Sequence, residues 1–258
     1  MKLGVTLESF GLPIRRGLAE ARRLGLTGVQ MAAAGELMPD RLADTGKREL
    51  RHLLRSNGLE LTALACPLRH GLNELANLQQ RIDRVRQVMA LSFDLGARIV
   101  VVQAGQIHDD EAEPSVAVMR ESLLALGQFG DRTGTTLALE TGLESGATLR
   151  AFLDKLDTGG LGVNYDPGSL LMNGFNPVDN LAPLKDRIVH VHARDARRVN
   201  VSRTVEVPIG HGDVDWMQFL GTLCAFEYRD WVVIDCESGQ DRLADVAAGA
   251  TFLRRLVV

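Results

Sequence analysis

The chain has 258 residues, the usual length of a one-domain α/β barrel and enough to bury a large core. Hydrophobic residues make up 45% and charged residues 24%, as in ordinary globular proteins. The net charge of -4 disfavours nucleic acid or an anionic membrane surface as a partner, because those partners attract basic surfaces. Composition therefore favours a globular protein that binds neither.

Cysteine usage indicates the compartment. Cys66, Cys224 and Cys236 form no C-x-x-C pair, and an odd number without that spacing is typical of a reducing environment. The N-terminal residues become polar too soon for a signal peptide, and no run approaches the roughly 18 apolar residues of a membrane-spanning helix. We expect a cytoplasmic protein without a membrane partner.

Short apolar runs rich in β-branched residues recur along the chain. They occupy residues 3–6, 28–31, 60–64, 99–102, 136–139, 162–165, 188–192 and 231–235. The stretches between them have helical periodicity, as in residues 81–96, where Ile82, Val85 and Met89 share one face. This alternation predicts a parallel sheet covered by helices.

A closed barrel and an open doubly wound sheet both fit this alternation. Eight units at this length favour the barrel, and neither a G-x-G-x-x-G turn after the first strand nor a Walker-type loop is present. We predict a single (β/α)8 TIM-barrel domain over residues 1–258. Residues 195–215, after the seventh strand, form the longest segment expected to be irregular, and long loops of this kind usually serve a site.

Residues able to bind a metal follow four neighbouring strands. Glu140 ends the fifth strand, Asp166 follows the sixth and His192 ends the seventh. Asp235 and Glu237 end the eighth, two residues apart and hence on one face. The C-terminal ends of barrel strands form one rim, where the active sites of such barrels lie.

Together these side chains predict a site for one divalent cation. Carboxylates with one imidazole suit Mn2+, Mg2+, Co2+ or Zn2+, and a cation keeps clustered carboxylates ionised. Each acid alone is more simply explained as a helix N-cap or an ion-pair partner, and Asp166 before Pro167 as the start of a turn. His190, one strand step deeper than His192, is better explained as a hydrogen-bonded core histidine. The combination, rather than any single residue, indicates the metal.

The region from Glu140 to Glu237 resembles the xylose isomerase-like barrels, which include sugar isomerases and epimerases, inosose dehydratases and endonuclease IV. The resemblance extends over nearly the whole chain. It implies that Glu140, Asp166 and His192 bind one metal ion. The family's fourth ligand, a glutamate, falls on Asp235, which is shorter by one methylene, so Glu237 stays open as a second possibility for that ligand.

The resemblance also implies contacts to a substrate. Arg198 lies six residues past His192, where related ketose epimerases carry an arginine that contacts substrate. His70 and His108 follow the third and fourth strands and could contact sugar hydroxyls or phosphate, although exposed loop positions explain them equally well. The stretch VPIGHGDVDW resembles the family's glycine-rich turn and tryptophan before the last helix.

The function implied by the resemblance is a metal-dependent isomerase or epimerase of a sugar or sugar phosphate. A metal that holds adjacent hydroxyl and carbonyl oxygens acidifies the neighbouring C–H and stabilises an enediolate. Glu140 and the acid after the eighth strand, Asp235 or Glu237, would remove and return the proton.

Three alternatives stay open. An inosose-type dehydratase would use the same metal and then expel a hydroxyl. An endonuclease IV-like hydrolase needs three zinc ions and extra histidines, but the chain has six histidines, and Ser169 stands where a D-x-x-H histidine would follow Asp166. A barrel that only binds a ligand is the third. Assembly into a homo-oligomer is compatible with each.

Overall fold

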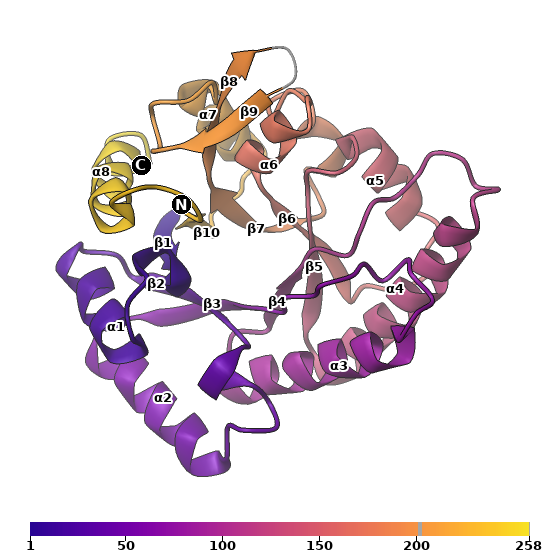
Figure 1. The fold of residues 1–258 in the computed structure, drawn as a ribbon, viewed down its shortest axis with the longest axis horizontal. Helices are drawn as coiled ribbons and strands as arrows, with labels where there is room; N and C mark the ends of the chain where they lie inside the picture. Colours follow the sequence, from indigo (N-terminus) through magenta and orange to yellow (C-terminus); the bar gives the residue numbers. More distant parts are fainter. Residues whose placement is uncertain (201–202, 258) are drawn as a thin grey trace.

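The computed structural model describes residues 1–200 and 203–257, in which eight parallel strands close into a barrel (Figure 1). Pairing of Lys2 with Trp231 through Val5 with Ile234 joins the first strand to the last and closes the barrel. The predicted eight-stranded TIM barrel is confirmed. Its strands are β1 (Lys2–Thr6), β2 (Gly28–Ala32), β3 (Glu60–Ala65), β4 (Ile99–Val102), β5 (Thr136–Glu140), β6 (Leu161–Tyr165), β7 (Ile188–Ala193) and β10 (Trp231–Ile234).

Helices surround this barrel on the outside (Figure 1). None of the helices in the described part of the chain is both long and apolar enough to cross a membrane. The α-helices are α1 (Ile14–Arg23), α2 (Asp44–Ser56), α3 (Leu78–Leu95), α4 (Pro114–Thr133), α5 (Gly146–Leu153), α6 (Pro167–Met172), α7 (Trp216–Ala225) and α8 (Arg242–Arg254). Short 3-10 turns add η1 (Leu7–Phe10), η2 (Gly35–Leu37) and η3 (Ala182–Leu184).

Strand alternation sorts the side chains into two apolar layers. On β5, Leu137 and Leu139 belong to the large core cluster that the helices share, whereas Ala138 belongs to a small cluster with Ala63 and Val101. These small side chains fill the barrel interior. Because residues two apart on a strand share a face, Glu140 lies on the same face as Ala138, one step nearer the strand's C-terminal end. The interior face of the barrel therefore turns polar at its mouth.

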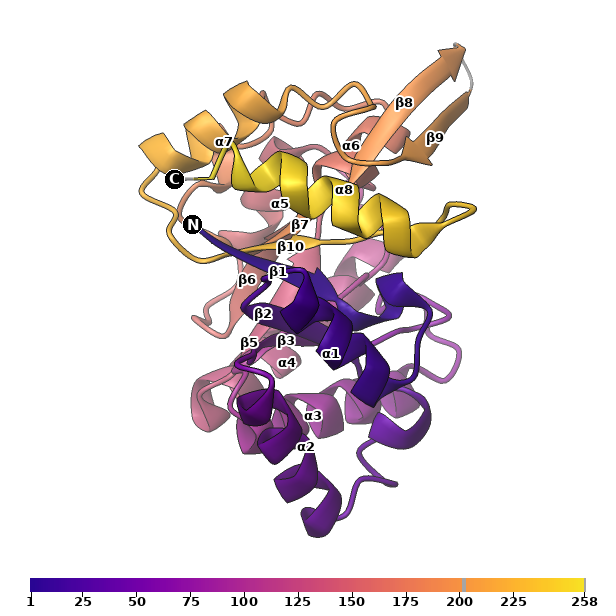
Figure 2. The same cartoon turned by 90° about the vertical axis from the view of Figure 1, so that its left-hand side faces the viewer.

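The segment predicted to be irregular, residues 195–215, contains a β-hairpin instead. Strands β8 (Asp195–Asn200) and β9 (Arg203–Val207) pair antiparallel, and the hairpin projects from the barrel (Figure 2). Residues 201 and 202 of the predicted segment lie outside the described residues. The expectation of irregular structure was wrong because Val199, Thr204 and Val205 are β-branched but are interspersed with charged residues, which hides the strand pattern.

Asp195, at the base of this hairpin, holds the following turn together. Its buried carboxylate accepts hydrogen bonds of 2.9, 3.1 and 3.3 Å from the backbone N–H groups of Gly210, Gly212 and Val214, and one of 2.9 Å from the indole of Trp216. A Cβ on Gly212 would lie 2.0 Å from Asp195 Oδ1, so glycine is required there. The glycine-rich turn and its tryptophan thus wrap a buried charge.

We expect Asp195→Ala to lower the free energy of unfolding by about 3 kcal/mol or more, because several buried N–H donors would lose their acceptor. Urea unfolding followed by tryptophan fluorescence measures this change. The exposed Asp109→Ala is the matched control and should change stability by less than about 0.5 kcal/mol. Equal effects of the two substitutions would contradict the role assigned to Asp195.

Candidate metal centre

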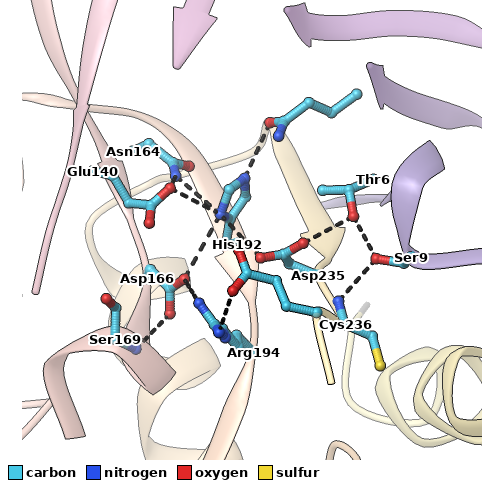
Figure 3. A network of polar contacts seen from close by, with 12 residues as sticks. Thr6, Ser9, Glu140, Asn164, Asp166, Ser169, His192, Arg194, Asp235 and Cys236 are labelled. Carbon is cyan, nitrogen blue, oxygen red and sulfur yellow. Dashed lines mark hydrogen bonds and ion pairs between the residues drawn. The ribbon is translucent and has the colours of Figure 1, made fainter. Parts of the chain in front are cut away.

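Glu140, Asp166 and His192 meet at the C-terminal mouth of the barrel (Figure 3). One potential ligand atom of each residue lies within 4.8 Å of the others. His192 Nδ1 is 3.6 Å from Glu140 Oε2 and 3.7 Å from Asp166 Oδ2. Within residues 1–200 and 203–257, no other group of three or more histidine, cysteine or acidic side chains comes together in this way.

Asp235 borders this group from the other side. Its Oδ2 lies 3.8 Å from His192 Nδ1, and its Oδ1 accepts a hydrogen bond of 2.9 Å from the hydroxyl of Thr6. Its backbone N–H still donates to the carbonyl of Ala193 on β7, at 3.0 Å, so the chain is in register with the barrel up to this residue. Asp235 is therefore the acid after β10 that the fold brings toward His192.

Glu237 takes a different position. Strand β10 ends at Ile234, so the alternation that would put Glu237 on the face of Asp235 no longer applies. Its Oε2 lies 2.6 Å from Nη2 of Arg194, and its side chain is 62% exposed. The structure pairs Glu237 with an arginine instead of bringing it to His192.

Asp166 provides the test of whether a cation fits. Its Oδ1 accepts a 2.8 Å hydrogen bond from the backbone of Ser169, which makes Asp166 the N-cap of α6, whereas its buried Oδ2 has no hydrogen-bond partner among the described residues. A buried acceptor without a donor costs about 1–3 kcal/mol. Because this oxygen faces His192 and Glu140, a cation bound among the three would supply the missing contact. Carboxylate oxygens with one imidazole nitrogen fit Mg2+, Mn2+, Co2+ or Zn2+.

Burial and the neighbouring charges shift the pKa values of Glu140 and His192. Burial is the main cause that raises the pKa of Glu140 to about 7, and the charge of Asp166 adds to it, while His192 acts in the opposite direction. Burial alone would lower the pKa of His192, but interactions with Asp166, Asp235 and Glu140 outweigh it and raise this pKa to about 9. In the absence of a cation, a proton on His192 therefore balances part of the negative charge.

A cavity of about 410 Å³ opens beside the group. Glu140, His192 and Asp235 line it, together with the polar side chains of Gln30 and Arg242. Asp166 is fully buried behind them and is not among the described residues that line the cavity. The volume lies in the range of sites for small molecules.

The residues that the resemblance assigned to substrate lie elsewhere. Arg198 is exposed on β8 and lines a separate depression with Phe175 and Thr204. His70 is exposed, with its Nδ1 3.0 Å from Oε2 of Glu74, and His108 is exposed in the loop after β4. None of the three is among the described residues that line the cavity beside His192. Contact of these side chains with a substrate thus stays a prediction that the geometry does not favour.

Arg194 is the arginine that the fold brings to the acids, and the sequence interpretation missed it. It follows β7 directly, its side chain is 9% exposed, and its Nη1 is 4.0 Å from Asp166 Oδ2. Burial lowers the pKa of Arg194, but Asp166, Glu206, Glu237 and Asp235 raise it well above its ordinary value, so it stays charged. A signal for Arg194 was available, since it continues the spacing of two that relates His190 to His192.

Glu206 on β9 completes this arrangement. Its Oε2 accepts from Arg194 Nε at 2.8 Å, and its Oε1 accepts from the backbone N–H groups of Glu237 and Ser238, each at 2.9 Å. Gly168 leaves the space for Arg194, because a Cβ there would lie 2.9 Å from Arg194 Cγ. The Arg194–Glu206 pair therefore ties the hairpin to the loop after β10. No sequence signal for Glu206 exists, because its partners are distant in the chain.

Fold and site together define a TIM barrel with a candidate metal centre at the C-terminal ends of its strands. The family model of the xylose isomerase-like TIM barrel matches residues 18–256, and the chain belongs to this family.

Individual relatives are distant. The inosose dehydratase of Geobacillus kaustophilus is 21% identical over 252 residues, which cover 85% of this chain and 79% of that protein. An inosose dehydratase of Clostridium botulinum is 26% identical over 151 residues, which cover 52% of this chain and 50% of that protein.

Solved structures agree closely in fold at low identity. A xylose isomerase domain protein from Planctomyces limnophilus superposes with a TM-score of 0.86 at 21% identity, covering 99% of this chain and 95% of that one. An L-ribulose 3-epimerase superposes with a TM-score of 0.82 at 17% identity, covering 100% of this chain and 95% of that one. A xylose isomerase-like barrel from Mycobacterium smegmatis, in complex with magnesium, superposes with a TM-score of 0.79 at 17% identity, covering 99% of this chain and 96% of that one.

Substitutions of two acidic residues test which of them bind the cation. We expect Asp166→Asn to weaken Mn2+ binding by more than about 100-fold, since loss of an outer-shell partner alone typically costs about 10- to 100-fold. Glu237→Gln, an equally conservative change at an acid paired with Arg194, should stay within about threefold of the wild type. Titration calorimetry measures both affinities. A larger loss in Glu237→Gln than in Asp166→Asn would overturn the assignment.

Proposed function

We propose that this chain binds one divalent cation through Glu140, Asp166 and His192, with Asp235 as the fourth ligand, and that it epimerises or isomerises a small carbohydrate. The observation that carries this proposal is the unequal exposure of the acids. Glu140 and Asp235 both line the cavity, with side chains 10% and 11% exposed, whereas Asp166 is fully buried. Asp166 could therefore bind the cation but not a substrate in the cavity, while the other two acids could also reach a substrate.

Glu140 and Asp235 approach the cavity from different sides. Glu140 ends β5 and Asp235 follows β10, and β6 and β7 lie between those strands in the barrel. His192 on β7 lies between the two acids, with its Nδ1 3.6 Å from Glu140 and 3.8 Å from Asp235. A carbonyl compound in the cavity would therefore have a carboxylate on each side, which is the arrangement that proton removal and return require.

Neighbouring side chains hold both carboxylates in orientation. Gln103 Nε2 donates to Glu140 Oε1 at 2.8 Å, and Thr6 donates to Asp235 Oδ1, so each acid keeps its other oxygen toward His192. A bound divalent cation would polarise the substrate carbonyl and acidify the adjacent C–H. Glu140 would then take this proton.

The fate of the proton decides the reaction. Its return to the same carbon from the opposite face, by Asp235, inverts that carbon and gives an epimerase. Its return to the neighbouring carbon interconverts an aldose and a ketose. The name of the L-ribulose 3-epimerase that shares the fold is consistent with the first outcome.

A dehydratase is the second candidate. The observation that favours it is the similarity to the Geobacillus kaustophilus inosose dehydratase over 85% of this chain. The same base would remove the proton beside the carbonyl, and the C–O bond of the hydroxyl on the next carbon would then break as its oxygen takes up a proton and leaves as water.

The reaction can be tested in deuterated water. We expect the Mn2+-loaded protein to place deuterium beside the carbonyl of a substrate among ketoses, inososes and their phosphates, as read by NMR. Glu140→Gln should slow this exchange by about 100-fold or more while it keeps the fold, because its amide is not a base. A product lighter by one water in the mass spectrum would identify a dehydratase. Neither exchange nor water loss across the panel, with Mn2+ bound, would contradict both enzymes.

Cation affinity should depend on pH. The pKa of His192, about 9, lies above its ordinary value, so at lower pH a cation must displace a proton from this residue. Affinity for Mn2+ should fall as pH falls from 8.5 to 6, by about tenfold per pH unit for one displaced proton, and protonation of Glu140 should add to the loss below about pH 7. Calorimetry in buffers of different ionisation enthalpy also counts the released protons. An affinity independent of pH would show that no proton is displaced.

A further inference from the structure

Two amide side chains contact the imidazole of His192 from opposite edges. Gln30 Oε1 on β2 lies 3.0 Å from His192 Nε2, and Asn164 Nδ2 on β6 lies 3.1 Å from His192 Nδ1. Each amide directly follows a shift in strand register. The pairing of β2 with β3 shifts between Val29 and Gln30. The pairing of β6 with β7 shifts between Val163 and Asn164. Irregularities of this kind re-aim side chains and are common beside active sites. Both breaks therefore set an amide against the same ring.

The orientation of each amide determines where the ring carries its proton. A carbonyl oxygen can only accept a hydrogen bond, so the contact with Gln30 requires a proton on Nε2 of His192. An amide nitrogen can only donate, so the contact with Asn164 requires a lone pair on Nδ1. The same amide nitrogen lies 3.4 Å from Glu140 Oε2, a second acceptor. Both contacts fit the tautomer with its proton on Nε2 and its lone pair on Nδ1, which is the form of the ring that could bind a cation through Nδ1.

The orientation of Asn164 is in turn supported from inside the barrel. Its Oδ1 lies 2.9 Å from Nδ1 of His190, and the Nε2 of His190 lies 3.2 Å from the hydroxyl of Thr62. Figure 3 shows Asn164 on its other side, beside His192 and Glu140. The hydroxyl of Thr62 can donate to His190, which leaves the Nδ1 proton of His190 for the Asn164 carbonyl. Asn164 thus presents its NH2 group to His192 and Glu140.

We propose that Gln30 is a positioning residue that sets the tautomer of His192. By accepting a hydrogen bond from Nε2–H, Gln30 leaves the Nδ1 lone pair directed at Glu140 and Asp166, where a cation would bind. Without that acceptor, the carboxylates would favour the tautomer with its proton on Nδ1, and this proton would block the lone pair. The inference rests on the proposed cation site and is independent of which sugar reaction follows.

Three substitutions at buried positions test this role. Gln30→Met removes the acceptor at similar volume and should weaken Zn2+ binding by about 10- to 100-fold, the usual effect of losing an outer-shell partner. Gln30→Glu keeps an acceptor and should bind Zn2+ at least as tightly as the wild type. Thr135→Val is the matched control, because Thr135 is as buried as Gln30 but its hydroxyl pairs with Thr133 and takes no part in the contacts around His192, and it should stay within about threefold. Chelator competition measures the affinities, and circular dichroism checks the fold.

A spectroscopic readout separates positioning from general damage to the core. With histidine nitrogens labelled and NMR-active cadmium bound, the nitrogen coupled to the metal should be Nδ1 of His192, and its Nε2–H should exchange slowly with water. In Gln30→Met that N–H should exchange much faster. Wild-type affinity in a folded Gln30→Met, or coupling of cadmium to Nε2, overturns the role of Gln30 alone. Failure of the wild type to bind Zn2+ or cadmium overturns the proposed cation site together with this inference.

Discussion

Repulsion among acids gathered at the barrel mouth is the constraint on which the rest of the site depends. Glu140, Asp166 and Asp235 all approach one imidazole, and Asp166 is fully buried while the other two are only about a tenth exposed. Like charges at such distances raise one another's pKa values unless a positive charge lies among them. The raised pKa of His192 and the Asp166 oxygen that has no hydrogen-bond partner both reflect this excess of negative charge around the imidazole. A divalent cation would relieve both.

Beyond the acids themselves, two adjacent residues after His192 fix the end of β7 from opposite sides. Arg194 turns toward the acids and is bound by Glu206 and Glu237, whereas Asp195 accepts the N–H groups of the turn that follows the hairpin. One face of this strand end thus carries the buried guanidinium of Arg194 and the other the buried carboxylate of Asp195, and each charged group has its own hydrogen-bond partners. Both the hairpin and the loop after β10 are positioned relative to His192 through these contacts.

Much of this site could be predicted because it depends on strand ends. Glu140 and His192 lie at the ends of their own strands and Asp166 directly after its strand, so alternation and the common direction of parallel strands are enough to bring them to one rim. The sequence signal ends where regular geometry stops. Strand β10 ends at Ile234, three residues before Glu237, so alternation no longer determines which way Glu237 faces, and the chain after His192 turns into the hairpin that carries Arg198.

The sequence by itself determined the eight barrel strands, the helices that alternate with them, and the set of acids with one histidine that the strands carry to the mouth. Those features follow from periodicity, which is local. Only the tertiary structure decided that Asp235 faces His192, that Glu237 pairs with Arg194, and that Gln30 reaches the far edge of the imidazole. These choices depend on breaks in register and on contacts between residues more than a hundred positions apart in some cases, for which a single sequence carries no local signal.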